Sequence, residues 1–271
     1  MSSAGAIPAV PLTLEGAWLL HQMARVRWTE WSAATPAERE AALGSLRELT
    51  VSLEAANSAL FRQFGHRGDL MFIHFRPAID DLHQAENAIA KSKIGRYLDV
   101  VHSYLSVVEL GLYESSVKTY EDLTARGLKQ HTEEWDAGIK EVLDRQRSAM
   151  EPRLNPQIPA HRYACFYPMN RRRGEQHNWY SLPIEERARL MHEHGMTGRR
   201  YHGKVRQVIS GSVGLDDWEW GVDLFSDDPL VFKELVYVMR FDPVSALYAE
   251  FGEFFVGTRS NADELCQMFA I

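Results

Sequence analysis

Hydrophobic positions in the first part of the chain change their spacing in a regular order. Residues 18–28 are mostly apolar and typical of an extended segment. After Thr35, the stretch "PAEREAALGSLRELTVSLEAA" combines a proline, charges and a 3.6-residue apolar period, which predicts a helix. The runs "SALFRQF" and "GDLMFIHF" flank a glycine-containing turn and predict a hairpin. A helix over 79–92 and a strand over 103–113 complete the order β-α-β-β-α-β.

The same order recurs in the second part of the chain. Its segments are the strand "HRYACFYPM", the helix "LPIEERARLMHEH", a hairpin of "KVRQVISG" and "DDWEWGVDLF", the helix "DPLVFKELVYVM" and the strand "ALYAEFGEFFVG". A duplicated unit of this kind predicts an α+β fold of two ferredoxin-like β-α-β-β-α-β repeats with antiparallel sheets. Two such sheets pack face to face or close into a barrel-like body, and the pattern leaves both arrangements open.

Three segments follow from this organisation. We expect a ferredoxin-like domain over 1–116, connector helices and a linker over 117–158, and a second ferredoxin-like domain over 159–271. The connector is charged and helix-permissive, and the proline-punctuated "EPRLNPQIPA" is expected to be a linker. The first dozen residues are small and proline-bearing, which predicts a mobile or arm-like lead-in.

In "DDWEWGVDLF", apolar residues alternate with Asp217, Glu219 and Asp223, which predicts a half-buried strand.

Composition narrows the function classes. The chain has 271 residues, of which 45% are hydrophobic, enough for a buried core, and its net charge of −7 argues against a dedicated nucleic-acid binder. The two cysteines, Cys165 and Cys266, form no CxxC pair, so neither a disulfide framework nor a thiolate metal site is expected. No run of about 18 apolar residues and no signal-peptide pattern occurs. These features predict a cytoplasmic protein without a membrane span.

The stretch "LMHEHGMTGRRY" carries two histidines near the predicted end of a helix. This helix is expected to begin near Ser181 and Pro183 and to end at Gly195. At 100° per residue, His194 lies on the side of Leu190 and Met191, whereas His192 lies about 160° away on the charged side. A zinc site needs further ligands, but a haem iron needs only one protein ligand. His194 is therefore a candidate haem ligand, with a hydrogen-bonded core imidazole as the alternative.

Two strands present polar side chains to the same space. The two-residue period puts Tyr163, Cys165, Tyr167 and Met169 on one face of the first, and Gln207 shares a face with Val205 and Ile209 on the second. A mostly apolar wall with a few polar groups suits a porphyrin, although an ordinary sheet core is the alternative. Arginines gather at the ends of these elements: Arg153, Arg171, Arg172, Arg173, Arg199 and Arg200. Guanidinium groups bind carboxylates in a bidentate manner, which favours a ligand with several carboxylates.

Uninterrupted sequence segments in the second half, such as "GSVGLDDWEWGV" and "HGMTGR", resemble those of a known family. The chain closely resembles the coproheme decarboxylases of the chlorite dismutase family, of the type found in Gram-positive haem synthesis. The resemblance implies paired ferredoxin-like domains and a homopentamer. It also implies that iron coproporphyrin III (coproheme) is substrate and redox centre, that hydrogen peroxide oxidises it, and that two propionates become vinyl groups to give haem b. Coproporphyrin ferrochelatase is an expected transient partner.

The resemblance assigns roles to seven residues. It makes His194 the proximal iron ligand, Tyr167 the catalytic tyrosine that forms the oxidising radical, and Gln207 the distal glutamine. Residues that it places around the propionates are Arg153, Met169, Ser245 and Arg171, the last where the family commonly has lysine. A true chlorite dismutase uses a distal arginine, but Arg206 lies on the strand face opposite Gln207, which disfavours that alternative. A non-catalytic haem-binding carrier or sensor has no use for Tyr167.

Overall fold

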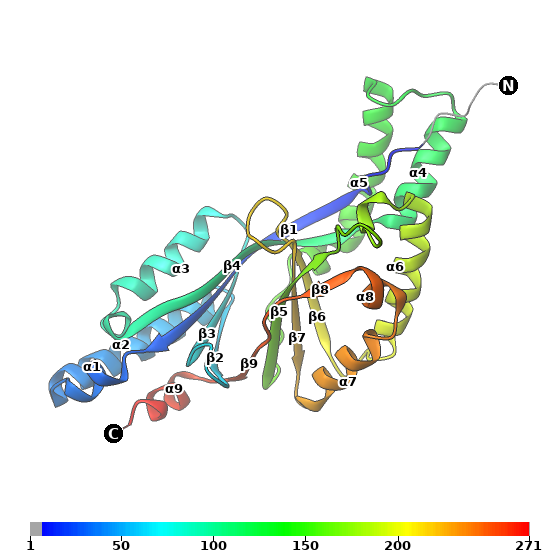
Figure 1. Ribbon diagram of the computed structural model, residues 1–271. Helices are drawn as coiled ribbons and strands as arrows, with labels where there is room; N and C mark the ends of the chain where they lie inside the picture. Colours follow the sequence, from blue (N-terminus) through cyan, green and yellow to red (C-terminus); the bar gives the residue numbers. More distant parts are fainter. Residues whose placement is uncertain (1–6, 271) are drawn as a thin grey trace.

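The computed structural model of the chain describes residues 7–270 and contains the duplicated order of elements (Figure 1). The first half consists of β1 (Thr13–Val26), α1 (Trp28–Ala33), α2 (Pro36–Ala55), β2 (Ser58–Gln63), β3 (Leu70–Arg76), α3 (Asp80–Lys91) and β4 (Leu98–Gly111). Two connector helices follow, α4 (Tyr113–Ala125) and α5 (Glu133–Leu154). The second half consists of β5 (Tyr163–Arg171), α6 (Ile184–Arg199), β6 (Arg206–Gly211), β7 (Trp220–Ser226), α7 (Leu230–Met239), α8 (Pro243–Tyr248), β8 (Ala249–Phe251), β9 (Phe255–Arg259) and α9 (Ala262–Met268). The predicted α+β class is confirmed.

The strands within residues 7–270 form one antiparallel sheet that closes on itself. Their order is β7-β6-β4-β1-β3-β2-β9-β5-β8, and β5 also pairs with β7. Eight strands therefore form a ring, and β8 extends from β5 outside it. The link between the two halves is thin, because β4 and β6 share only two paired positions and β2 and β9 only three. The predicted barrel-like body is thus a ring made of two half-sheets that face each other.

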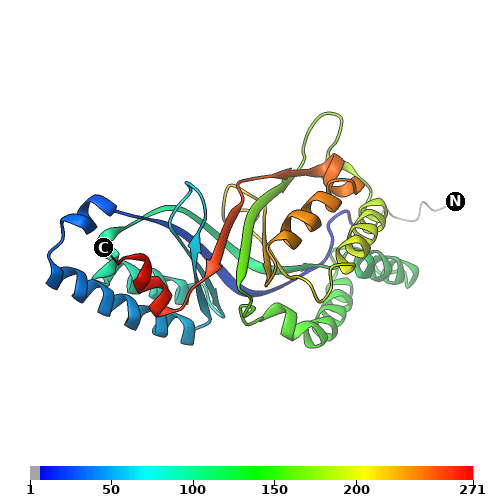
Figure 2. The ribbon, with the colours of Figure 1, turned by 90° about the horizontal axis from the view of Figure 1, so that it is seen from below.

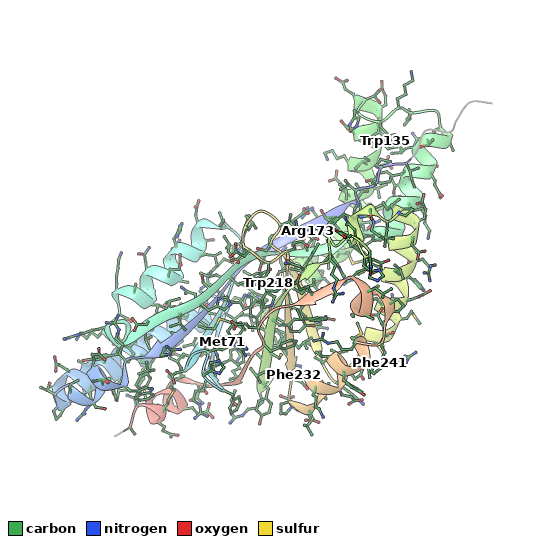
Figure 3. The ribbon with its side chains drawn as sticks, in the orientation of Figure 1. Met71, Trp135, Arg173, Trp218, Phe232 and Phe241 are labelled. Atoms are coloured by element: carbon green, nitrogen blue, oxygen red, sulfur yellow. The ribbon has the colours of Figure 1, made fainter. Side chains whose placement is uncertain are left out.

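Side chains pack in three layers across this ring. An inner core lies between the half-sheets and includes Met71 and Phe166, while an outer core lies under α2 and α3 and includes Leu46 and Phe72. A second outer core lies between the other half-sheet and α7, where Phe232 is buried (Figure 3). The two faces of each half-sheet thus contribute to different cores. The candidate site lies in the outer core of the second half.

The strand β7 corrects one expectation from the sequence. Within the strand its predicted solvent face is buried, because the first half-sheet covers it: Asp223 is 1% exposed, and Glu219 just before the strand is 8% exposed. Asp217, the third residue of that face, precedes β7 and is exposed. His21 of β1 meets Asp223 on the buried face, with 2.8 Å between Nε2 and Oδ1. The predicted half-buried strand is therefore wrong, and both faces of β7 are internal.

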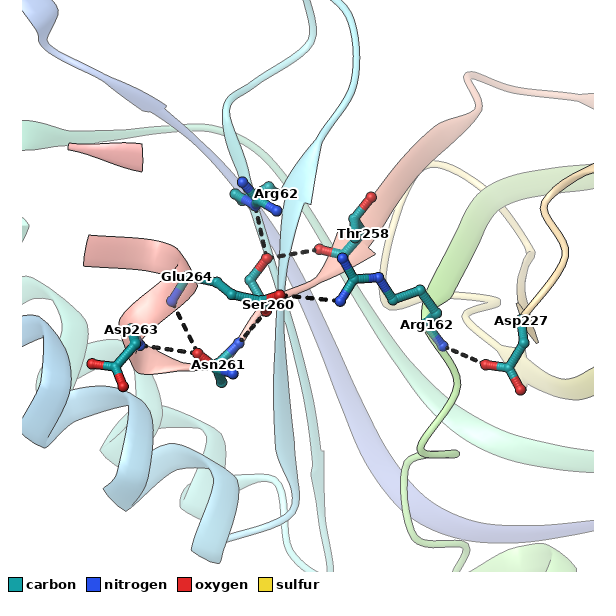
Figure 4. A network of polar contacts seen from close by, with 8 residues as sticks. All are labelled: Arg62, Arg162, Asp227, Thr258, Ser260, Asn261, Asp263 and Glu264. Carbon is teal, nitrogen blue, oxygen red and sulfur yellow. Dashed lines mark hydrogen bonds and ion pairs between the residues drawn. The ribbon is translucent and has the colours of Figure 1, made fainter. Parts of the chain in front are cut away.

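The end of the chain returns to the first half. Helix α9 packs beside α2 (Figure 2), and Trp31 Nε1 donates a hydrogen bond of 3.0 Å to the carbonyl of Phe269. A polar network fixes this return (Figure 4): Arg62 donates to Ser260 of the segment after β9, and Arg162 donates to Glu264 of α9. The C-terminal segment thus ties the two halves together.

Two predicted boundaries and one predicted strand are wrong. The helix α6 continues through Gly195 to Arg199, because Gly195 keeps helical backbone angles instead of the positive φ of a helix-ending glycine. The expected linker "EPRLNPQIPA" begins while α5 still continues, since this helix runs through Pro152 to Leu154. The expected strand over 246–257 is divided into the end of α8, β8 and β9.

The segment before β1, residues 7–12, is held against the connector helices, and we call it the N-terminal strap. Tyr120 Oη donates to the carbonyl of Val10 (2.8 Å), and the backbone of Leu12 bonds Ser116 Oγ and Leu112 N (both 2.8 Å). The described part of the predicted mobile lead-in is therefore pinned, and residues 1–6 lie outside the described range. Among the helices described, none combines the length and apolarity of a membrane-crossing segment.

Candidate active site

A cavity of about 740 Å³ lies in the second half, between the outer face of the half-sheet and the helices α6 and α7. Much of its wall is apolar, with Ile209 and Val222 from the strands and Leu235 and Met239 from α7. All seven residues that the sequence pointed to line this cavity: Arg153, Tyr167, Met169, Arg171, His194, Gln207 and Ser245. They come from α5, β5, α6, β6 and α8, so the fold brings them together.

His194 lies on the cavity side of α6, as the helical spacing predicts. Its side chain is 24% exposed, and its Nδ1 is 2.6 Å from Oδ2 of Asp242. His192 is 52% exposed and pairs with Glu114 away from the cavity. Because a carboxylate partner fixes Nδ1 as the protonated nitrogen, Nε2 of His194 carries the free lone pair that a metal ion needs.

Asp242 is a site residue that the sequence did not reveal. It caps α8 by accepting from Val244 N (3.1 Å), and its Oδ2 also accepts from Ser245 Oγ (3.0 Å). Burial alone would raise the pKa of this carboxyl, but its hydrogen bonds to His194, Val244 and Ser245 together lower it. The ionised Asp242 therefore orients both His194 and Ser245. The "DP" pair of a helix cap was visible in the sequence, but its partner lies 48 residues away.

Tyr167 occupies the centre of β5 opposite an irregularity in the neighbouring strands. Phe251 pairs with Met169 and Phe255 pairs with Phe166, so the β8–β9 side has one residue more than β5. This extra residue lets Phe254 stack on the Tyr167 ring, with centroids 4.6 Å apart. Burial raises the pKa of the Tyr167 phenol, which therefore stays protonated at neutral pH.

Arg171 is held at the cavity wall by aromatic rings. Its guanidinium carbon lies 4.8 Å from the ring centre of Trp179 and 6.0 Å from that of Trp220. Burial lowers the pKa of Arg171, and its Nη1 is buried without a hydrogen-bond partner in the described chain. An unpartnered buried guanidinium N–H is costly unless an anion accepts from it. The position thus suits a ligand carboxylate.

The other predicted arginines differ in their surroundings. Arg153 lines the cavity from the last turn of α5 and is largely exposed, whereas Arg172, Arg173, Arg199 and Arg200 lie outside the lining. Gln207 lines the cavity with Ile209 on β6, and Arg206 is exposed and outside it. The alternation predicted for β6 therefore holds, and Gln207, not Arg206, reaches the cavity.

Two further ionisable residues of the cavity wall were missed by the sequence reasoning. Glu109 lies near the end of β4, where Trp220 Nε1 approaches its Oε1 at 3.4 Å and burial raises the pKa of the carboxyl. Arg187 lines the cavity from the first turns of α6 and is only 4% exposed. An acidic residue inside the apolar "SVVELGL" was the one signal for Glu109 in the sequence. Nothing distinguished Arg187 from the other arginines of its helix.

The described side chains of the cavity cannot bind a metal ion without further ligands. Within residues 7–270 no group of three or more His, Cys, Asp or Glu side chains could hold a bare metal ion. A metal bound at His194 therefore needs most of its ligands from elsewhere, as in an iron porphyrin. The apolar wall, the free Nε2 of His194 and the unpartnered N–H of Arg171 fit a porphyrin that carries carboxylates.

The fold and the cavity define an α+β protein with duplicated ferredoxin-like halves and one imidazole facing an apolar, arginine-bearing pocket. The sequence profile of the family described as chlorite dismutase matches residues 39–260. The chain belongs to this chlorite dismutase family.

Individual relatives agree over nearly the whole chain. A coproheme decarboxylase of Thermus thermophilus is 45% identical over 265 residues, which cover 96% of each protein. A solved structure described as a novel heme-binding protein from Thermus thermophilus has a TM-score of 0.82 and 42% identity, with 98% of this chain and 100% of that chain covered. A chlorite dismutase mutant of Candidatus Nitrospira defluvii shares the fold, with a TM-score of 0.70 and 19% identity over 95% of this chain and 96% of that chain.

Proposed function

We propose that this protein is a coproheme decarboxylase that converts iron coproporphyrin III into haem b with hydrogen peroxide. The observation that carries the proposal is the meeting of His194, Tyr167 and the unpartnered guanidinium of Arg171 on one apolar cavity. A coproheme decarboxylase with 45% identity over 96% of the chain supports it. Each propionate loses carbon dioxide, a proton and two electrons to become a vinyl group, and hydrogen peroxide takes up two electrons and two protons to become two water molecules.

In this proposal the residues of the cavity divide into ligand, anchors and oxidant. His194 binds the iron through Nε2, and Asp242 keeps its ring in the required orientation and tautomer. Arg171 and Arg153 bind propionates, with Arg171 replacing the lysine common in the family; Met169 and Ser245 line the same region. A planar guanidinium held between two indoles binds a carboxylate in a fixed direction, which a flexible lysine does not.

Tyr167 carries oxidation to the propionate. When bound, the iron porphyrin supplies the centre that reacts with peroxide. The phenol of Tyr167 is buried and protonated, so it gives up an electron and a proton together, and it regains both from the substrate side chain. Stacking on Phe254 holds the ring in one place while this occurs. Gln207, which lines the same cavity, would face the bound porphyrin with a neutral side chain and add no charge.

Chlorite dismutation and haem carriage are the alternative functions. Chlorite dismutation would require a cation at the distal position, but Arg206 projects to the side of β6 away from the cavity. A carrier would need the ligand and the cations but would gain nothing from a buried tyrosine beside them. Coproheme decarboxylation uses all of these groups.

Mass analysis of the porphyrin tests the proposal directly. The protein is mixed with coproheme, peroxide is added in steps, and the extracted porphyrin is weighed by mass spectrometry. The expected product has lost two formic acid equivalents and passes through a three-propionate intermediate. Unchanged coproheme would contradict the proposal, and oxygen release on addition of chlorite would favour the chlorite dismutase.

We also propose the setting in which the reaction takes place. The two cysteines are unpaired and buried, which suits the reducing cytoplasm. The family resemblance supports a homopentamer and transient contact with the coproporphyrin ferrochelatase that delivers coproheme. Size-exclusion chromatography with light scattering tests the number of subunits.

A further inference from the structure

One face of α6 presents four residues to the cavity at regular helical spacing. They are Arg187, Met191, His194 and Gly198, at steps of four, three and four residues. Arg187 therefore lies two turns before the imidazole, about 10 Å along the helix axis. This face carries one cation whose partner the helix does not provide.

Arg187 is a buried cation without a carboxylate. It is 4% exposed, and no carboxylate among residues 7–270 lies within ion-pair distance of it. Its Nη2 donates to the carbonyl of Ala9 in the N-terminal strap, and its Nε is buried without a partner. Two residues along the helix, Arg189 is exposed and pairs with Glu186 and Glu193. Burying an uncompensated charge is costly, so the compensating anion is expected from outside the chain.

A second guanidinium with an unpartnered donor, that of Arg171, lines the same cavity. Arg171 Nη2 contacts the sulfur of Met191 at 3.6 Å, and Met191 is one turn from Arg187 on the same helix face. Arg171 Nη1 and Arg187 Nε are both buried donors without acceptors in the described chain. Two free donors thus flank Met191 on one side of the cavity. The Met191 sulfur is only a weak acceptor and already receives Arg171 Nη2, so these two donors have no acceptor among the described residues.

We propose that Arg187 binds a carboxylate of the porphyrin together with Arg171, in the part of the cavity that the N-terminal strap lines. This inference rests on the proposed function for the identity of the ligand. The strap residues Ala9, Val10 and Pro11 line the cavity, and the Ala9 carbonyl holds the guanidinium of Arg187 in place before the ligand arrives. A preset guanidinium binds a carboxylate with less loss of side-chain freedom than a free one.

Binding titrations without peroxide test Arg187 separately from catalysis. Wild type, Arg187→Gln, Arg187→Lys and the surface control Arg189→Gln are titrated with coproheme, and tryptophan quenching and the Soret band give Kd. Loss of a charged hydrogen bond is expected to weaken binding in Arg187→Gln about tenfold or more. Arg187→Lys is expected to recover part of this loss, and Arg189→Gln to match wild type.

Two further ligands distinguish two causes of weaker binding in Arg187→Gln: loss of a contact to a carboxylate, and distortion of the cavity wall. The tetramethyl ester of iron coproporphyrin III keeps the ring and the iron but has no ionised carboxylate, so Arg187→Gln should bind it as tightly as wild type does. Titration with haem b shows which carboxylate Arg187 binds. If Arg187→Gln weakens haem b binding as much as coproheme binding, the carboxylate belongs to a propionate that the product keeps. If it weakens haem b binding less, the carboxylate belongs to a propionate that the reaction removes. Wild-type affinity for coproheme in Arg187→Gln, or an equal loss for the ester, would overturn the proposal. A protein that passes these tests but releases no carbon dioxide would contradict only the proposed function.

Discussion

Two histidines separated by one residue have different environments in α6. His194 faces the cavity and is fixed by Asp242, while His192 faces Glu114 at the surface. The difference follows from the helix period and is visible in the sequence. The fixed orientation of the imidazole is not, because it depends on a carboxylate brought in by α8.

Replacing each histidine in turn tests the assignment of the iron ligand. His194→Ala is expected to change the ferric Soret and charge-transfer bands of the coproheme complex, because the iron loses its protein ligand. His192→Ala is expected to leave the spectrum of wild type unchanged. The opposite pattern would show that the exposed histidine binds the iron.

Tyr167→Phe separates binding from oxidation. The ring keeps its stacking on Phe254, so coproheme affinity should stay within about threefold of wild type, since only one hydroxyl is lost. Peroxide should then release no carbon dioxide, because the phenol O–H is gone. Gas release and porphyrin mass are measured in parallel. Turnover at the wild-type rate would remove Tyr167 from the mechanism.

His74 gives the protein an acid-sensitive group away from the cavity. Burial and the nearby Arg76 and His21 lower the pKa of His74 to about 3, while its pKa in the unfolded chain is about 6.5. Its contribution to stability is therefore complete above about pH 6.5 and is lost as the pH falls toward 3, by at most about 1.4 kcal/mol per pH unit. His74→Gln should lose less stability between pH 6.5 and 4 in urea titrations. The exposed His83→Gln should follow wild type, and identical slopes for all three proteins would contradict the assignment.

At the scale of elements, the local sequence predicts whether a segment is a helix or a strand more accurately than it predicts where the segment begins and ends. The capping box of Thr35 and Glu38 starts α2 at the predicted residue. The strand expected over 246–257 failed because Gly252 and its neighbours form the irregularity opposite Tyr167. A side chain at Gly252 would lie 2.8 Å from the ring of Pro168 and 3.0 Å from Trp218. Tertiary crowding, not local preference, thus decides this stretch.

Gly195 is predicted to be a weak point of α6 that an alanine improves. It lies in the helix interior with open space where a methyl group would be added, so Gly195→Ala should stabilise the protein by about 0.5–1 kcal/mol. Thermal unfolding measures the change, and the coproheme spectrum should stay the same. In contrast, Gly221→Ala should destabilise, because its methyl group would lie 2.7 Å from the Tyr104 ring and 2.8 Å from Ser210 Oγ. Destabilisation by Gly195→Ala would mean that the helix ends at residue 195 after all.

At the scale of the whole molecule, the two halves share one inner core and a buried contact between His21 and Asp223. His21 and Asp223 are 0% and 1% exposed, and they join β1 of the first half to β7 of the second. Phe166, stacked on His21 with centroids 3.9 Å apart, is the neighbour of Tyr167 on the opposite face of β5. The first half therefore supports the strand that carries Tyr167, and it also lines part of the cavity through the N-terminal strap and Glu109 of β4.

Replacing only one residue of the His21–Asp223 pair should lower the free energy of unfolding more than replacing both with apolar residues. Asp223→Ala leaves a buried imidazole unpaired, and a loss of about 3–5 kcal/mol is expected. The double variant His21→Leu with Asp223→Leu should be less destabilised than the sum of the two single leucine variants, because it leaves no unpaired polar group behind. Urea unfolding followed by circular dichroism completes this double-mutant cycle. Strictly additive losses would mean that the two residues do not interact.

The sequence by itself determined the repeated order of elements, the face of β5 that carries Tyr167 and the face of α6 that carries His194. These are properties of near neighbours, since strand and helix periods repeat within a few residues. Three features depend on the tertiary structure alone. His194 pairs with a residue 48 positions away, and the buried Asp223 pairs with one 202 positions away. Arg187 donates to the N-terminal strap, which lies at the other end of the sequence. Contacts at such separations exist only after the ring of strands has closed, so no local pattern in the chain encodes them.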